Sequence, residues 1–460
     1  MNRKSWVILS VSIGVYMSTL DASIVNISLP TIIQSLNTQL STVAWVVMAY
    51  LIVITGCLLL MGRFSDLYGQ RRIYLLGFSI FTIGSALCSF SPSIQFLIGS
   101  RMIQGLGASA LMANSPAIVT TAFPEEQRGK ALGMLGSVVS AGFLTGPILG
   151  GFLVEHFGWR SIFFINLPIG IIGIYLCSKV LDRDVPKSSA RVDLQGGLLL
   201  FSSLTFLLLF LDRIAQGSDP LLWVWLFLSL FSFGLFIVAE TRSSFPLVEL
   251  KVFKRRLFIS SLGASFLSFL ISAAHTFVIP FFLQNILEFS PSKTGMFIFP
   301  VALTVMVTAP LGGRFSDRVG VRMPATIGLA ITSLTVFSFI FLKPGANDLD
   351  ILWRQVVLGI GISLFNPANN SAIIGSLPRE SVGLASSFLA LARNLGLVMG
   401  VAFAEMVIAF KLPAISLESL KAGPSLESIQ DVWKLMLIVG FLAILISWAR
   451  EDKSSVPKHL

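Results

Sequence analysis

The sequence predicts an all-helical protein that crosses a membrane many times, because three features of the chain agree. Of its 460 residues, 54% are hydrophobic and only 12% are charged, whereas a soluble domain carries roughly 25% charged residues. The apolar residues form long runs, and two short motifs recur at nearly the same spacing. A chain this apolar has too few polar residues to cover a surface that faces water, so lipid must be its solvent.

The two repeated motifs indicate that the chain consists of two related halves. Gly62–Gly69 returns as Gly313–Gly320, 251 residues later, with five consecutive residues identical. Phe123–Ala131 returns as Leu377–Ala385 at a spacing of 254, with Pro, Glu, Gly and Ala in the same places. Internal repeats of this kind are typical of secondary transporters.

Fourteen segments are long and apolar enough to span a bilayer, for which a helix needs about 20 residues. We expect these spans at residues 6–29, 43–62, 73–91, 94–122, 130–153, 162–181, 194–212, 221–240, 257–286, 293–312, 323–342, 351–376, 382–410 and 432–449. Most joints are short and contain turn residues, and the longest, 411–431, is expected to lie outside the membrane.

The spacing of the first motif leaves room for six helices and one additional pair between its two copies. The sequence therefore predicts an N-terminal six-helix bundle over 1–190, a two-helix insertion over 191–245 and a C-terminal six-helix bundle over 246–460.

The basic residues predict the orientation of the chain. When the loops are assigned alternately from an inside N-terminus, the inside segments hold 23 Lys and Arg and the outside segments hold eight. Cytoplasmic loops carry such an excess, so both termini are predicted to lie inside. The net charge of +10 does not indicate nucleic-acid binding, because the basic residues sit in short loops without a sustained basic face.

An acid within the first span is the strongest functional candidate in the sequence. A charge near the bilayer centre costs about 2.5–3.5 kcal/mol, which makes membrane-embedded ionisable residues functional candidates. Asp21 lies roughly 22 Å from the inner end of its helix, and Arg101 about 10 Å from the outer end of the fourth, so we expect both at similar depth. Our hypothesis is that Asp21 exchanges a proton or a cation and that Arg101 tunes it; the alternative is a static buried pair.

Other polar residues fall inside later spans and are weaker candidates. His275 is either a proton relay or a packed histidine, and Glu405 either serves substrate or protons or reaches outward. The stretch 366–370 is expected to break its helix with three amides, which suits a cavity wall or hydrogen bonds between helices. The candidates for a substrate cavity are Asn26, Asn366, Asn370, Arg393, Asn394 and Glu405.

A row of small residues marks the fifth span. Gly142, Gly146 and Gly150 recur every four residues, with Pro147 and Gly151 beside them. Small residues on one face let another helix approach closely, and a proline releases a backbone hydrogen bond. The pattern predicts a tight, bent helix.

The repeated loop motif predicts a conformational latch. Asp66 and Asp317 are expected to accept hydrogen bonds at a helix N-terminus, and the neighbouring arginines to pair with them or with anionic lipid. The alternative is that these loops only set orientation. The latch residues are Gly62, Asp66, Gly69, Arg71, Arg72, Gly313, Asp317 and Gly320.

Four of these stretches together resemble the major facilitator superfamily, in its fourteen-helix branch of drug:proton antiporters. Gly62–Arg72 is similar to the signature between helices two and three, and Leu20–Pro30 to the first-helix signature. Arg101–Ala108 is similar to the fourth-helix motif, and Gly142–Gly151 to the fifth-helix motif of antiporters.

Three positions depart from these signatures, while other stretches extend the likeness to nearly the whole chain. Leu67 and Gln70 stand where basic residues are usual, and Ser23 where threonine is usual. The stretches Trp159-Arg160, Phe163–Gly170 and Arg393–Gly396 are also similar to this branch.

The resemblance implies a major facilitator fold and a proton-driven exporter of small lipophilic or amphipathic compounds across the plasma membrane, in bacteria the inner membrane. It implies a proton gradient as the energy source, with Asp21 and Arg101 in proton coupling. The sequence shows no phosphate-binding loop, metal cluster or nucleophile–base pair, so we expect no cofactor, metal or enzymatic activity, no nucleic-acid partner, and a monomer. A periplasmic adaptor is not indicated. The open alternatives are a lipid flippase and a symporter or importer of metabolites.

Overall fold

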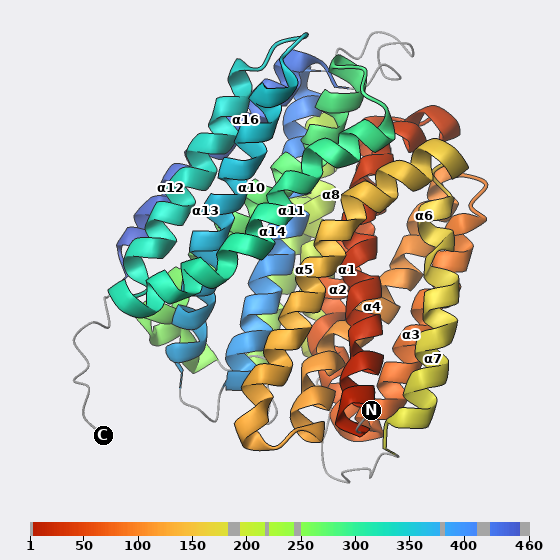
Figure 1. Ribbon diagram of the computed structural model, residues 1–460, viewed down its shortest axis with the longest axis vertical. Helices are drawn as coiled ribbons and strands as arrows, with labels where there is room; N and C mark the ends of the chain where they lie inside the picture. Colours follow the sequence, from red (N-terminus) through yellow and green to blue (C-terminus); the bar gives the residue numbers. More distant parts are fainter. Residues whose placement is uncertain are drawn as a thin grey trace. The chain divides into compact units, whose positions relative to one another are not determined.

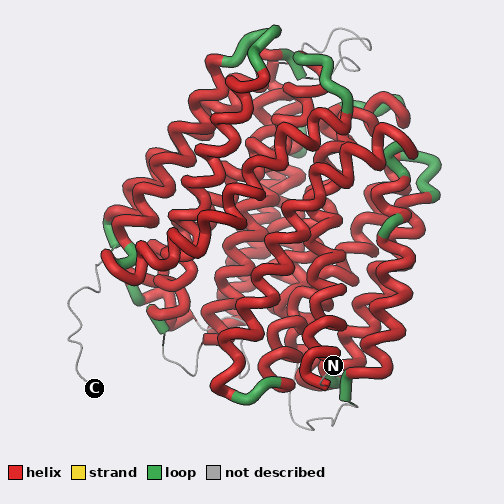
Figure 2. Tube along the Cα trace, in the orientation of Figure 1, coloured by secondary structure: helices red, strands yellow, loops and turns green. Residues whose placement is uncertain are grey.

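A computed structural model describes residues 3–182, 194–216, 220–242, 250–377, 382–411 and 424–450, and these form helices joined by short connections (Figure 1, Figure 2). The longer helices are α1 (Arg3–Leu36), α2 (Leu40–Tyr68), α3 (Gln70–Ser89), α4 (Ile94–Ala122), α5 (Glu125–Phe157), α7 (Asn166–Val180), α8 (Leu194–Gln216), α9 (Leu222–Arg242), α10 (Arg256–Phe281), α11 (Pro291–Val319), α12 (Arg322–Ser338), α13 (Asp348–Gly375), α14 (Val382–Lys411) and α16 (Leu426–Trp448). The short ones are α6 (Ser161–Phe164), η1 (Leu250–Lys254), η2 (Phe282–Ile286) and η3 (Phe339–Phe341).

The predicted all-helical fold with fourteen spans is confirmed in the described part of the chain. With α6 and α7 taken as one broken span, fourteen helices have membrane length. Thirteen of them are also apolar enough by composition to cross a membrane. The fourteenth is α13, which has 28 residues and carries more polar side chains.

The structure differs from the prediction at the start of one helix and in the middle of another. The final helix begins at Leu426 rather than 432, because Ser425 caps it: the Ser428 amide donates to Ser425 Oγ at 3.2 Å. The expected break at Asn366-Pro367 is wrong, since α13 runs without interruption from Asp348 to Gly375. Proline is tolerated inside membrane helices where neighbouring groups compensate for the missing backbone bond.

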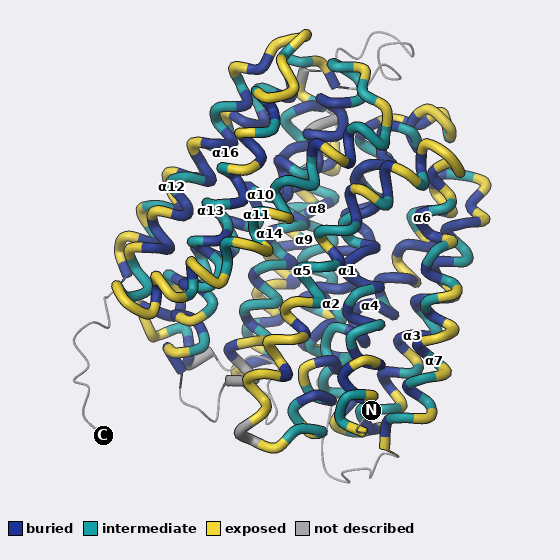
Figure 3. Tube along the Cα trace, viewed as in Figure 1, coloured by how far each residue is buried: buried dark blue, intermediate teal, exposed yellow. Residues whose placement is uncertain are grey.

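The chain forms two compact units. The first contains Met1–Val248 and Phe289–Met296, and the second contains Glu249–Glu288 and Phe297–Lys411 and continues from Pro424. More than half of the residues of α1, α2 and α10 are buried, whereas many side chains of α9 are exposed (Figure 3). The three-part division predicted from the sequence stays a prediction.

Helices α8 and α9, which the sequence predicts to be an insertion, pack within the first unit. Trp45 Nε1 on α2 donates to Asp212 Oδ1 on α8 at 3.2 Å. A Cβ on Gly56 of α2 would lie 2.5 Å from the Phe201 ring, so α8 lies directly against α2. Ser203 on α8 and Ser229 on α9 each donate to the other's backbone carbonyl at 3.0 Å.

The repeated motifs lie at equivalent joints of the two halves, as a duplication predicts. The first repeat joins α2 to α3 and, in its second copy, α11 to α12. Gly69 and Gly320 end the preceding helices with φ of 99° and 87°, and each amide donates to the serine carbonyl four residues earlier at 2.9 Å. The second repeat leads into α5 and α14, the fifth helix of each half.

Replacing Gly69 by alanine is expected to destabilise the protein, because L-residues rarely adopt its positive φ. Such strain costs about 1–3 kcal/mol, and we expect a lower melting temperature in detergent. Gly62→Ala provides the matched control. Gly62 lies inside α2, where an added Cβ would have nothing within 4 Å, and alanine favours the helix by about 1 kcal/mol. Equal melting temperatures for the two variants would contradict this account of the joint.

Candidate functional site

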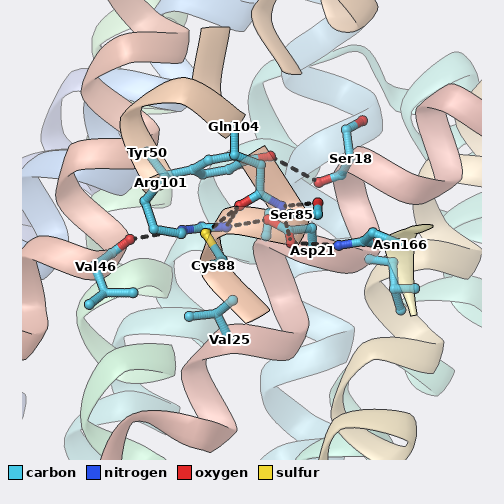
Figure 4. A network of polar contacts seen from close by, with 12 residues as sticks. Ser18, Asp21, Val25, Val46, Tyr50, Ser85, Cys88, Arg101, Gln104 and Asn166 are labelled. Atoms are coloured by element: carbon cyan, nitrogen blue, oxygen red, sulfur yellow. Dashed lines mark hydrogen bonds and ion pairs between the residues drawn. The ribbon is translucent and has the colours of Figure 1, made fainter. Parts of the chain in front are cut away.

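A buried ion pair joins α1 to α4 in the first unit. Asp21 on α1 is 0% exposed and Arg101 on α4 is 1% exposed. Arg101 Nη1 donates to Asp21 Oδ2 at 2.5 Å (Figure 4). The two residues predicted to lie at similar depth are therefore in direct contact.

Two amides complete the coordination of the Asp21 carboxylate. Gln104 Nε2 donates to Asp21 Oδ1 at 2.8 Å, and Asn166 Nδ2 donates to the same oxygen at 3.0 Å. With Arg101, the carboxylate thus accepts three hydrogen bonds (Figure 4). Donors of this kind stabilise the ionised form of a carboxylate, and charge-assisted bonds are about twice as strong as neutral ones.

The Arg101 guanidinium is fixed from α2 as well as from α1. Its Nε donates to the backbone carbonyl of Val46 at 3.0 Å. The Tyr50 ring lies 3.9 Å from the guanidinium carbon, and the Phe163 ring lies 5.7 Å from it. A planar guanidinium both stacks on aromatic rings and donates in several directions, which a lysine ammonium cannot reproduce.

Gln104 connects the ion pair to α3. Its Oε1 accepts from Arg101 Nη1 at 2.6 Å, and its Nε2 also donates to Ser85 Oγ at 2.8 Å. Cys88 Sγ approaches Gln104 Oε1 at 3.7 Å. The network thus draws on α1, α2, α3, α4 and α7, five helices of one unit.

In the conformation seen here, the Asp21 side chain is paired with Arg101 and closed off from solvent. A proton can reach Asp21 only if the pair opens and water gains access, and a protonated acid no longer needs Arg101 as a counter-ion. The site is therefore suited to linking proton uptake with movement of α1 against α4.

Gln104 and Asn166 were not among the residues that the sequence predicted for this site. Gln104 follows Arg101 by three positions on one helix, so the two share a face, and this spacing was a usable signal. Asn166 begins α7 after the break at Ile165, where a single unbroken span was expected. Nothing in its local sequence shows that its side chain reaches Asp21.

The glycine row of α5 packs against the same helix that carries Asp21. A Cβ on Gly142 would lie 2.1 Å from Thr19 Oγ1, and one on Gly146 would lie 1.8 Å from Ser23 Oγ. Gly150 faces Ile24 in the same way, at 2.6 Å. The close approach predicted for this row is present, and it occurs on α1.

Pro147 and Gly151, the other members of this row, face the first turn of α11. A Cβ on Gly151 would lie 2.3 Å from the Pro291 carbonyl oxygen, and one on Gly295 would lie 2.2 Å from that of Pro147. Helix α5 therefore meets close neighbours on two sides.

The latch residues lie at the α2–α3 joint and its repeat, but the described contacts do not define a latch. Asp66 is exposed in the last turn of α2, before the joint rather than at the start of α3. Arg71 Nη2 donates to the Ser178 carbonyl at 2.7 Å, tying α3 to α7. Gly313 and Asp317 occupy the matching turn of α11. Their function as a latch stays a prediction.

The predicted cavity residues are distributed over both units. Asn26 bonds along its own helix, from Nδ2 to the Ala22 carbonyl at 3.3 Å. In the second unit, Asn394 and Glu405 are buried on α14. Half-buried members of the set are Arg393 on α14 and Asn366 and Asn370 on α13. Their role in a common cavity stays a prediction.

Replacing Gln104 by leucine is expected to slow proton-driven transport about tenfold. The change leaves Asp21 with two donors instead of three, and an unmet buried hydrogen bond costs about 1–3 kcal/mol. The measurement is substrate-induced proton movement in everted vesicles. Gln127→Leu on the exposed start of α5 is the control and should transport normally. Full activity of Gln104→Leu would show that this amide is dispensable.

Comparison with known proteins places these observations in a family. Residues 11–401 match the family model described as Major Facilitator Superfamily. The riboflavin transporter RibZ of Clostridioides difficile is 35% identical over 99% of this chain and 100% of its own. The multidrug resistance protein Stp of Mycobacterium tuberculosis is 33% identical over 90% of this chain and 78% of its own.

A solved structure agrees in fold. The bacterial homologue of the human lysosomal transporter Spinster, in an inward-facing conformation, aligns over 97% of both chains with a TM-score of 0.66 and 17% identity. The repeated halves, the fourteen helices and the matches over nearly the full length lead to one assignment: this chain is a multi-pass membrane transporter of the Major Facilitator Superfamily, and not an enzyme.

Proposed function

We propose that this transporter exports small lipophilic or amphipathic compounds in exchange for protons, as a fourteen-helix drug:proton antiporter. The observation that carries the proposal is the fully buried Asp21, held by Arg101, Gln104 and Asn166. A buried acid with a breakable counter-ion is suited to binding one proton and releasing it on the other side.

Alternating access links this proton to the substrate. When the site opens outward, water reaches Asp21 and a proton binds, which separates the acid from Arg101. When the site opens inward, the proton leaves and the ion pair forms again. The outward gradient of substrate is maintained because each conformational return requires a proton.

The relatives support small organic molecules as the substrate class. Several are multidrug resistance or multidrug transporter proteins by name, including Stp and MdtP of Bacillus subtilis. The buried glycine row on α5, a motif associated with antiporters through the resemblance described above, also favours export over symport.

Proton release in everted membrane vesicles tests the proposal. Vesicles containing the protein are acidified inside, and ethidium and other lipophilic cations are added while a pH-sensitive dye reports the lumen. We expect substrate to release protons only in vesicles that contain the transporter. Accumulation without proton movement would contradict antiport.

Riboflavin uptake is the second candidate function, and one specific observation favours it. RibZ, named as a riboflavin transporter, matches this chain end to end at 35% identity. Uptake of labelled riboflavin by cells that lack their own transporter would test it. Uptake with no export of lipophilic cations would replace our first proposal by this one.

The proposed orientation places both termini in the cytoplasm and the protein in the plasma membrane, in bacteria the inner membrane. It is supported by the excess of basic residues in alternate loops, 23 against eight. Cysteine labelling with membrane-impermeant reagents, at introduced residues in single loops, would test it.

A further inference from the structure

The second unit contains a buried polar cluster that the proposed mechanism does not use. His275 on α10 is 3% exposed and Gln355 on α13 is 0% exposed, and the Gln355 amide lies beside the imidazole. The Phe339 ring is 4.6 Å from the imidazole, and the Trp433 ring of α16 is 6.3 Å from it, centroid to centroid. The Phe339 and Trp433 rings also contact each other, 5.3 Å between centroids, so His275 lies beside an aromatic pair.

The polar atoms of this cluster are not satisfied by hydrogen bonds. Both imidazole nitrogens, both amide atoms of Gln355 and Trp433 Nε1 are buried and make no hydrogen bond of normal length and angle, although the Gln355 amide lies beside the imidazole. Buried polar groups normally have hydrogen-bond partners, so five such atoms close together require an explanation. Such a cluster is retained more readily if its hydrogen bonds change during the working cycle.

The internal repeat relates this cluster to the Asp21 site. His275 follows Asp21 by 254 positions, and Gln355 follows Arg101 by the same 254, which is the spacing of the second repeated motif. The helices agree, since α1 and α10 open the two halves and α4 and α13 are their fourth helices. The caps agree as well: Ser93 caps α4 and Asn347, 254 positions later, caps α13.

The aromatic ring from the sixth helix completes the parallel. Asn166 on α7 supplies a donor to Asp21, and Trp433 on α16, the sixth helix of the second half, lies against His275. Each unit therefore places one titratable side chain of its first helix against its fourth and sixth helices.

We propose that His275 is a second proton-binding residue, the counterpart of Asp21 in the second half, with Gln355 and the rings of Phe339 and Trp433 supporting its protonated form. The proposal rests on the proton-coupled function proposed above. Gln355 Oε1 can accept from an imidazolium N–H, and aromatic faces attract a cation.

Among the described residues, the acidic side chains that form ion pairs on α13 and α16 have partners other than His275. On α13, Arg354 pairs with Asp350 at 2.7 Å, and on α16, Lys434 pairs with Asp431 at 2.7 Å. Helix α14, which carries Arg393 and Glu405, approaches α10 through Gly396 and Gly400 at Leu270 and Ala274. In our proposal, hydration of the opened site rather than a permanent counter-ion allows the imidazole to bind a proton.

Solvent reaches neither side chain in this conformation, since Asp21 is 0% exposed and His275 is 3% exposed. A proton can therefore reach either residue only after its site opens. The proton simply binds to a ring nitrogen and later leaves it.

The experiment is a measurement of proton stoichiometry in reconstituted vesicles. The reversal potential of substrate flux gives the number of protons exchanged per substrate, with ethidium as the probe. We compare the unaltered protein with His275→Gln, which keeps an amide of similar size but cannot titrate. His156→Gln is the matched control, because His156 is an exposed histidine on α5.

We expect His275→Gln to transport with one proton fewer per substrate, and His156→Gln to keep the full number. A further variant, Gln355→Leu, should keep the stoichiometry but reduce the rate at acidic outside pH, since the imidazolium loses its acceptor. An unchanged stoichiometry in His275→Gln would overturn the proposal. If His275→Gln fails to fold, His275→Asn serves the same comparison, because it also cannot titrate.

The two proposals fail in different ways. If the unaltered protein shows no proton flux, proton-coupled function itself is wrong. If it shows proton flux and His275→Gln retains every proton, only the second site is wrong.

Discussion

Replacing Asp21 by asparagine is expected to abolish proton-driven export while downhill exchange of substrate persists. Asparagine cannot take up a proton, so no proton accompanies the conformational return and no gradient can form. Export against a gradient should fall to the level of vesicles without the protein, measured as substrate accumulation in everted vesicles at a fixed pH difference.

The same change is expected to lower stability. Arg101 would lose its anion while remaining buried at 1% exposure, and breaking one partner of a buried pair costs about 3–5 kcal/mol. Thermal unfolding in detergent measures this cost. Asp21→Glu keeps both the charge and a titrating group, so we expect it to regain stability and proton-driven export.

Asp212→Asn is the control that shows whether the loss of any buried acid, rather than of Asp21 in particular, stops proton-driven export. Asp212 is also buried in the first unit and accepts from Trp45 Nε1 at 3.2 Å, and an asparagine oxygen can still accept that bond. We expect proton-driven export to continue. Full proton-driven export in Asp21→Asn, or its loss in Asp212→Asn, would disprove the assignment of coupling to Asp21.

The second large effect is expected for Gly146→Val on α5. Its Cβ would lie 1.8 Å from Ser23 Oγ and 3.3 Å from the Ile24 amide nitrogen, so α1 must move away. Overpacking of this kind costs about 1–3 kcal/mol. Asp21 lies two residues before Ser23, and a displacement of about 1 Å in a site that depends on orientation can cost about 100-fold in rate. Transport assays and melting temperature measure the two effects.

Gly136→Val separates packing from helix propensity. Gly136 lies on the same helix and has nothing within 4 Å of an added Cβ, so the intrinsic cost of a β-branched residue in the helix is matched. We expect near-normal transport from this control. If both variants transport alike, close packing of α5 on α1 has no part in the cycle.

The fold could be predicted from the sequence because membrane insertion and duplication leave long, regular signals. Apolar runs of bilayer length located all fourteen helices, and the doubled Gly-Arg-Phe-Ser-Asp stretch located equivalent joints. The failures had local causes. Glu427 and Asp431 concealed the first turns of α16, and Pro367 suggested a break where α13 continues.

The site was only partly predictable, because a short stretch of sequence does not show which side chains of other helices it contacts in the fold. Asp21 and Arg101 stood out since charges are costly in lipid. The amides that complete the site, Gln104 and Asn166, are common residues whose role appears only when α4 and α7 are packed against α1. The relation of His275 to Gln355 likewise required both the repeat and the folded contacts.

The attachment of α8 to α2 has a practical consequence for following the working cycle. Trp45 and Gly56 hold α8 against α2, and the serine pair 203 and 229 joins α9 to α8, so we expect both helices to move together with the first unit. Trp223 at the start of α9 is 71% exposed and far in sequence from Asp21 and Arg101. A fluorophore or spin label there would report the motion of the first unit without perturbing its chemistry.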